Sequence, residues 1–259
     1  MDEAASTRAS AAQEQGLTFP ITGALIRALG GALIRAVGGT LIRVGCVIVG
    51  LSVPGASSAL AADCPQPEMA PRVILETGFA QPTLDTSKTA SQLAAILASQ
   101  QGASAVGNAV GLTSTRPTYS YQTRVSAKQV GNQRYCVFLT DLTIRFQYES
   151  ILVYVARQYR PSTCPYHVTL DHELRHVALY RQGYEAFLPR LSARAAEVAR
   201  QVNPMKASSR ATAKQVHLKR IQRELEPLFQ AFFKEQRARN LEMDTPQAYG
   251  LERDKCLDW

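Results

Sequence analysis

The spacing of apolar residues changes once along this 259-residue chain, near residues 160–164. Before that point apolar and polar residues alternate through two runs, Arg134–Gln147 and Ile151–Tyr159. After it, apolar residues recur every three or four positions. A period of two is typical of strands and a period near 3.6 is typical of helices. The pattern excludes an all-helical or all-strand chain and predicts an α+β fold in which the strands come first.

The region before the change is expected to form a small antiparallel sheet, because its strands are joined by short connections such as Gly131-Asn132. A strand near Val73 and a helix after Asp85 precede it. Residues 101–118 are rich in Gly, Ser, Ala and Thr, so we expect a loop there. The three predicted strands of the sheet are residues 119–125, 134–147 and 151–159.

The region after the change is expected to be mostly helical, over residues 164–202 and 216–240. Gly183 and Pro189 should interrupt the first stretch, because glycine weakens a helix and proline removes a backbone donor. We therefore divide the chain after its leader into a domain, 62–203, and a helical C-terminal extension, 204–259, packed on the same domain.

Residues 1–61 have the pattern of a leader. Three arginines, the last of them Arg43, precede an uncharged run, Val44–Val53, and a small-residue cleavage site at Ala59-x-Ala61. This order is typical of a secretory signal. The arginines interrupt every run of about 18 apolar residues that a membrane span needs. The pattern predicts a secreted or periplasmic protein with no stable membrane span after cleavage.

Four cysteines remain beyond the leader: Cys64, Cys136, Cys164 and Cys256. An even number in an exported chain predicts two disulfides. Of the three possible pairings we favour Cys136 with Cys164 and Cys64 with Cys256, since the second bond would join the two ends of the mature chain.

The residues His172-Glu-Leu-Arg-His176 match the pattern His-Glu-x-x-His. Histidines four apart project from one face of a helix, so both imidazoles can bind one zinc ion, while Glu173 can act as the base for water. Tyr180 and Tyr184 follow on the same stretch. Either could donate to a developing oxyanion, although core aromatic residues need no such role.

This motif on a helix that follows strands resembles the zincin metallopeptidases, and His-Glu-Leu-x-His resembles their gluzincin branch. More loosely, Cys164–Glu173 resembles bacterial exported proteins described as predicted secreted zinc-dependent proteases of unknown substrate. The resemblance implies a zincin-like fold and a zinc cofactor. It also implies an edge strand for an extended substrate, here within Arg134–Tyr159.

The resemblance implies a third zinc ligand as well. A metzincin would carry Gly and His where this chain has Leu179 and Gln182, which excludes that branch. A gluzincin takes a glutamate from a second helix, and the spacing from His176 favours Glu197. Glu185 is the rival, provided that the chain turns at Gly183.

Two functions of different class follow. The first is an exported zinc hydrolase, a peptidase acting on a peptide or protein substrate. The second is a non-catalytic exported binding protein of zincin-like fold, whose basic stretch Lys206–Arg239 would attract anionic envelope components. The net charge supports this second function: it is +8 for the whole chain and +7 without the 4 basic and 3 acidic residues of the leader. No helix-turn-helix, zinc-finger or aromatic RNA motif is present, so a nucleic-acid partner is not expected.

Overall fold

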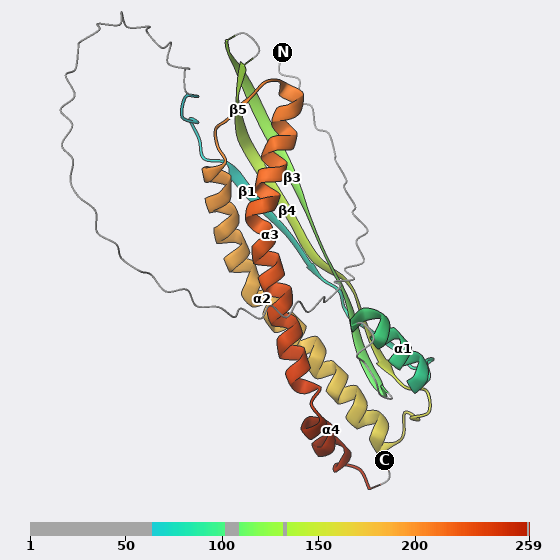
Figure 1. Cartoon of the computed structure of the whole chain (residues 1–259). Helices are drawn as coiled ribbons and strands as arrows, with labels where there is room; N and C mark the ends of the chain where they lie inside the picture. The colour runs from blue at the N-terminus through green and yellow to red at the C-terminus, as the bar shows by residue number, and fades with distance from the viewer. Residues whose placement is uncertain (1–63, 102–108, 132–133, 258) are drawn as a thin grey trace, which may run out of the picture. The chain divides into compact units, whose positions relative to one another are not determined.

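A computed structural model describes residues 64–101, 109–131, 134–257 and 259. Within these ranges it contains a five-stranded sheet and four helices, a mixed α/β architecture (Figure 1). The predicted leader, 1–61, lies outside the described residues. In chain order the elements are β1 (Arg72–Phe79), β2 (Pro82–Asp85), α1 (Ala90–Gln101), β3 (Gly111–Gly131), β4 (Arg134–Val155), α2 (Cys164–Gln201), β5 (Met205–Ala207), α3 (Arg210–Met243) and α4 (Pro246–Arg253).

Strand β4 is the centre of the sheet. β1 and β3 pair with the same residues of β4, as Thr77 and Tyr119 both do with Phe146, so they lie on its opposite edges. β2 and β5 share the edge with β1, because β3 also pairs with their partners. The expectation of an antiparallel sheet is corrected here: β3 and β5 run antiparallel to β4, but β1 and β2 run parallel to it. Among the described residues no strand pairs with the outer edge of β3.

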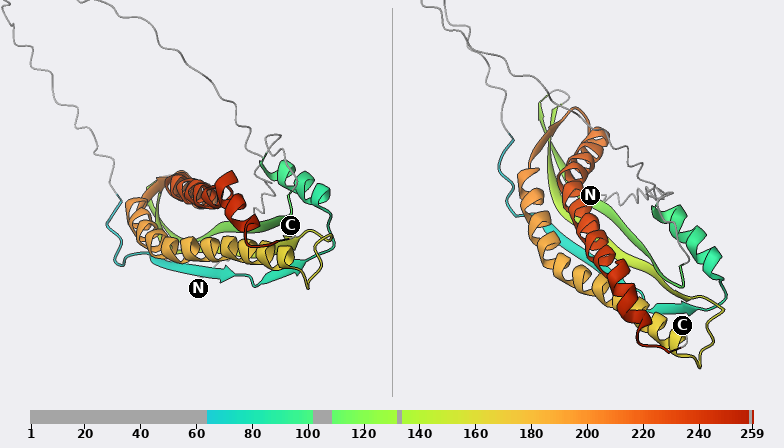
Figure 2. Two further views of the ribbon diagram at one scale, coloured as in Figure 1. Left: turned by 90° about the horizontal axis from the view of Figure 1, so that it is seen from below. Right: turned by 60° about the horizontal axis from the view of Figure 1, so that its bottom comes forward.

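The two long helices α2 and α3 cover one face of this sheet (Figure 2). Alternate residues of β4, among them Ile144 and Phe146, are fully buried in the core that the sheet shares with the helices. Arg145 lies between them in sequence and instead pairs with Glu76 of β1, 2.7 Å away. This alternation is the period of two seen in the sequence.

A register shift between β3 and β4 leaves no residue of β3 directly opposite Glu149 and changes which residues face the helices. Beyond it, Val153 joins the main core, whereas Tyr154 packs with Leu93 of α1 in a separate cluster. Thr113 lies opposite Val153 and therefore points toward α2. The shift thus aims one end of β3 at the residues of the candidate site.

Helix α2 runs for 38 residues without a break. The predicted interruptions are wrong. At Gly183, a Cβ would overlap the amide of Gln236 on α3, so the glycine serves close helix packing. Pro189 lies between Phe187 and Leu191, whose burial in the core compensates for the lost hydrogen bond.

Other boundaries also differ from the expectations. Residues 111–118, expected as a loop, belong to β3, and β4 continues through the predicted gap at 148–150. The second predicted helix is longer than expected, and α4 carries no apolar pattern long enough to have indicated it. The described residues, from Cys64 onward, cluster as one compact unit.

All four predicted cysteines form disulfides, but the predicted pairing is wrong. The bonds join Cys64 to Cys136 and Cys164 to Cys256, with Cα atoms 5.4 Å and 5.8 Å apart. Cys136 lies near the start of β4 and Cys164 follows its end, so the extended strand separates them by roughly 60 Å at 3.3 Å per residue. A search of the described helices finds none that is long and apolar enough to cross a membrane.

Candidate metal centre

The first half of α2 presents the His-Glu-x-x-His motif to the interior. His172, Glu173 and His176 are each no more than 5% exposed. The helix begins after Thr163 with Pro165 in its first turn, a position that suits proline, so the motif lies two turns inside a regular helix. The two imidazoles project from one face, as their spacing predicts.

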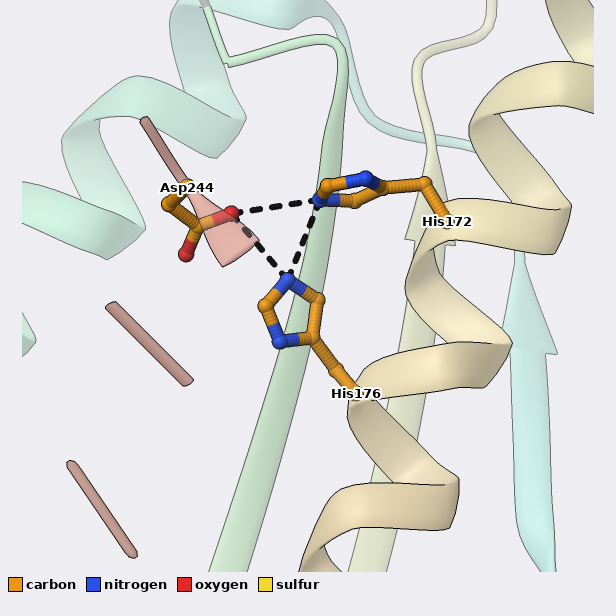
Figure 3. A group of neighbouring side chains, drawn as sticks. All are labelled: His172, His176 and Asp244. Carbon is orange, nitrogen blue, oxygen red and sulfur yellow. Dashed lines mark hydrogen bonds and ion pairs between the residues drawn. The ribbon is translucent and has the colours of Figure 1, made fainter. Parts of the chain in front are cut away.

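Asp244 completes a group with the two histidines (Figure 3). It follows the last residue of α3, and its Oδ1 lies 3.2 Å from His172 Nε2 and 3.1 Å from His176 Nε2. The two Nε2 atoms are themselves 3.1 Å apart. Three ligand atoms therefore form a nearly equilateral triangle.

This triangle fits one face of a zinc coordination tetrahedron. With bonds of 2.0–2.1 Å, ligand atoms in such a tetrahedron lie about 3.3 Å apart. Two imidazole nitrogens and one carboxylate oxygen are ligand types that zinc accepts, and three protein ligands leave a fourth position for water or substrate. The residues present thus fit a catalytic type of zinc site.

Two neighbours hold the ligands in place. His176 Nδ1 lies 2.8 Å from Asn240 Oδ1, which can only accept, so in the neutral imidazole Nδ1 carries the proton and the lone pair of Nε2 faces the group. The hydroxyl of Tyr249 on α4 donates to Asp244 Oδ1 over 2.8 Å. Metal-binding histidines and carboxylates commonly have such outer partners.

The charges in the site are strongly coupled. Burial lowers the pKa of His176, but the hydrogen bond and charge of Asp244 outweigh it, so that the pKa is raised. Burial acts to raise the pKa of Asp244, yet the hydrogen bonds of His172 and His176 hold it well below its usual range. A proton on His176 and a metal ion thus compete for the same space, and metal binding should release that proton.

Glu173 lies beside the triangle but is not part of it. Burial raises the pKa of Glu173, against the opposing charge of His176 and the hydrogen bond from Thr113. The Thr113 hydroxyl lies 2.8 Å from Glu173 Oε2. A Cβ at Gly111 would overlap Glu173 Oε1, so the glycine makes room for this carboxylate. One strand, β3, therefore orients the candidate base.

A cavity of about 700 Å³ opens onto these groups. The initial part of β3, including Gly111, Thr113 and Thr115, forms one wall, and α2 and α3 form others. Apolar residues such as Leu97 of α1 and Trp259 extend the lining. The substrate strand expected within Arg134–Tyr159 is corrected here: β4 is paired on both edges, whereas residues of β3 line the cavity and no described strand pairs with the outer edge of β3.

Neither predicted third ligand reaches the histidines. Because α2 is unbroken, Glu197 lies about 30 Å from His176 along the helix at 1.5 Å per residue. It pairs instead with Arg194, 2.8 Å away. Glu185 is exposed on the same helix, about 13 Å along it. These candidates required a turn after the motif, and the structure has none.

Asp244 was missed because it belongs to no motif and lies 68 residues beyond His176. The available signal was weak: an acidic residue that ends an apolar-periodic stretch, just before Thr245-Pro246, a common helix start. Only the packing of α3 against α2 brings it to the histidines.

The two tyrosines named with the motif differ in their surroundings. Tyr180 lines the cavity, and Thr115 hydrogen-bonds to it. Tyr184 packs in the core, where its hydroxyl oxygen lies 3.1 Å from the carbonyl oxygen of Phe146. Tyr180 therefore borders the site and Tyr184 is structural.

The site thus combines three converging side chains that could hold a metal ion, a separate buried carboxylate, and a cavity lined in part by β3, whose outer edge pairs with no described strand. Comparison of the chain with protein-family models, curated proteins and solved structures finds no match.

Proposed function

We propose that the protein is a zinc-dependent hydrolase that cleaves peptide bonds. The observation that carries the proposal is the convergence of His172 Nε2, His176 Nε2 and Asp244 Oδ1 within 3.2 Å of one another, next to a carboxylate that is not a ligand. We propose Asp244 as the third zinc ligand, in place of Glu197, which the sequence had favoured. When bound, zinc would polarise a carbonyl group and make a bound water more acidic.

The chain's own groups supply the proton transfers. Glu173 is 4% exposed, and Thr113 holds one of its oxygens. Its raised pKa makes it a stronger base than a carboxylate in water. It accepts the proton that water loses on attacking the carbonyl carbon, and it delivers that proton to the departing amine. The water oxygen ends in the new carboxylate.

A peptide is favoured as substrate because of the strand beside the cavity. The outer edge of β3 offers backbone donors and acceptors that no described strand uses, and an extended peptide can pair with such an edge. We propose export as well, since two disulfides are typical of oxidising compartments.

The test uses the full chain, freed of metal and loaded with one equivalent of zinc. Glu173→Gln should keep the zinc and lower hydrolysis of an internally quenched peptide library by about 10²- to 10⁴-fold, because it removes only the base. Glu197→Gln is the matched control: it makes the same change on an exposed part of α2 and should alter neither property.

Two results would contradict the proposal. One is a zinc-loaded wild-type chain that cleaves no peptide of the library. The other is a Glu173→Gln variant that binds zinc and cleaves as fast as the wild type.

A further inference from the structure

Helix α4 brings a tyrosine to the third ligand. Tyr249 donates its hydroxyl proton to Asp244 Oδ1 over 2.8 Å, the same oxygen that both histidines face. Its ring lies on the ring of His172, with centroids 5.3 Å apart and planes 30° apart. One side chain therefore touches two members of the triangle.

The position of Tyr249 is held from both ends of α4. At the start, the Thr245 side chain caps the helix by accepting from the amide of Ala248. At the end, Glu252 pairs with Arg175 of α2, and Cys256 is bonded to Cys164. These links join α4 to the helix that carries the motif, so the tyrosine is anchored although it is 42% exposed.

We propose that Tyr249 is a positioning residue that sets the metal affinity of the site through Asp244. A carboxylate oxygen has two lone pairs, so Oδ1 can accept from Tyr249 and still bind a cation. Asp244 follows the last residue of α3, so the helix does not fix the orientation of its carboxylate. The hydrogen bond keeps Oδ1, rather than Oδ2, turned toward the histidines.

The inference rests on the metal site of the proposed function but does not require hydrolysis. Outer partners of this kind typically contribute 10- to 100-fold to metal affinity. Tyr249→Phe removes the hydroxyl and keeps the ring on His172, so it isolates the hydrogen bond. Tyr119→Phe is the matched control, since it removes a hydroxyl that also donates to a carboxylate, Glu226, in a pair that does not line the cavity.

The experiment measures the zinc dissociation constant of the full, metal-free chain by competition with a coloured chelator. Tyr249→Phe should weaken binding by at least about tenfold and Tyr119→Phe by less than about twofold. In an Asp244→Ala background, Tyr249→Phe should have no further effect, because the hydroxyl acts through that carboxylate. With cobalt in place of zinc, Tyr249→Phe should also shift the visible absorption bands.

The possible outcomes distinguish a failure of the metal site from a failure of the role of Tyr249. A wild-type chain that binds zinc no more tightly than Asp244→Ala overturns the metal site, and the role of Tyr249 with it. Tight wild-type binding with an unchanged Tyr249→Phe variant overturns the role of Tyr249 alone. An equal loss with and without Asp244 also overturns it, because the tyrosine would then act on the fold in general.

Discussion

Helices α2 and α3 pack against each other in two regions of opposite character. In one region, Phe187 of α2 stacks on Phe232 of α3 with ring centroids 4.3 Å apart, and both side chains are almost fully buried. In the other, His176 of α2 meets Asn240 of α3, and Asp244 follows. The same pair of helices therefore builds an apolar core along one stretch and a polar group along the next.

The difference shows how the site can gather polar groups at close range. Burying polar groups costs free energy unless each finds a partner, and three acceptors that face one another are unfavourable without a proton or a cation between them. The aromatic region offsets this cost, because large buried rings contribute several kcal/mol each. We expect changes in the apolar region to alter stability, and changes in the polar region to alter metal binding and hydrolysis.

The largest expected effect on stability is in the apolar region. Phe229 is fully buried between the sheet and α2, so Phe229→Ala should lower the free energy of unfolding by about 3–5 kcal/mol. Denaturant unfolding of the metal-free chain measures it, with Val216→Ala, an exposed position on α3, as the control. Zinc affinity should persist where the variant is folded. A fully folded Phe229→Ala variant that no longer binds zinc would contradict the separation of an apolar region for stability from a polar region for metal binding.

The two disulfides stabilise different regions, and only one of them lies close to the metal site. Removing either by a double Cys→Ser change should destabilise the chain by about 2–4 kcal/mol. Only the loss of Cys164–Cys256 should also weaken zinc binding, because this bond ties α4 to the start of α2. The Cys64–Cys136 pair anchors the segment before β1 to β4 and serves as the matched control. Equal zinc affinity in both variants would show that α4 needs no tether.

A smaller effect is expected at Gly111. Gly111→Ala would push Glu173 out of place, and a displacement of about 1 Å can slow catalysis by up to roughly 100-fold. Zinc affinity should not change, since Glu173 is not a ligand. Gly250→Ala is the control, because a Cβ there meets nothing within 4 Å. Steady-state hydrolysis and zinc titration of both variants decide the matter, and an unaffected turnover in Gly111→Ala would argue against Glu173 as the base.

The smallest expected effect is on the pH dependence of folding stability. Burial lowers the pKa of His217, which is fully buried on α3 and lies near Arg220. The unfolded chain takes up a proton on this residue below about pH 6.5, whereas the folded chain takes it up only at a lower pH, so stability is complete above about pH 6.5 and declines below it. The decline from pH 7.5 to pH 5 is at most about 2 kcal/mol for one group. Metal-free His217→Leu should show a correspondingly weaker pH dependence of unfolding, and an identical dependence would exclude this histidine as its source.

The parts of the site that sequence analysis predicted are local. His172, Glu173 and His176 lie within two helical turns, and a fixed helical period determines which side chains share a face. The even number of cysteines predicted two disulfides. Their pairing depends on the length of β4, which holds Cys136 and Cys164 far apart. Asp244 also depends on the tertiary structure, because it reaches the histidines only where α3 returns along α2.

Gly183 illustrates why the fold was predicted only in part. A glycine in a helical pattern can mark a break or a close approach, and the sequence around it does not distinguish the two. The structure shows the second, since Gln236 occupies the space of a Cβ. The wrong choice led to the predicted turn and to the candidate ligand Glu185 that depended on it, whereas Glu197 was chosen for its spacing from His176. The parallel pairing of β1 and β2 was likewise not readable, because strand partners far apart in sequence leave no local pattern.

The zinc content of two variants decides whether Asp244 or Glu197 completes the metal site. We expect one equivalent of zinc in the purified wild-type chain and in Glu197→Ala, but less than about a tenth of an equivalent in Asp244→Ala, which removes one of the three proposed ligands. Elemental analysis after dialysis measures it. Full zinc in Asp244→Ala together with loss in Glu197→Ala would contradict the account.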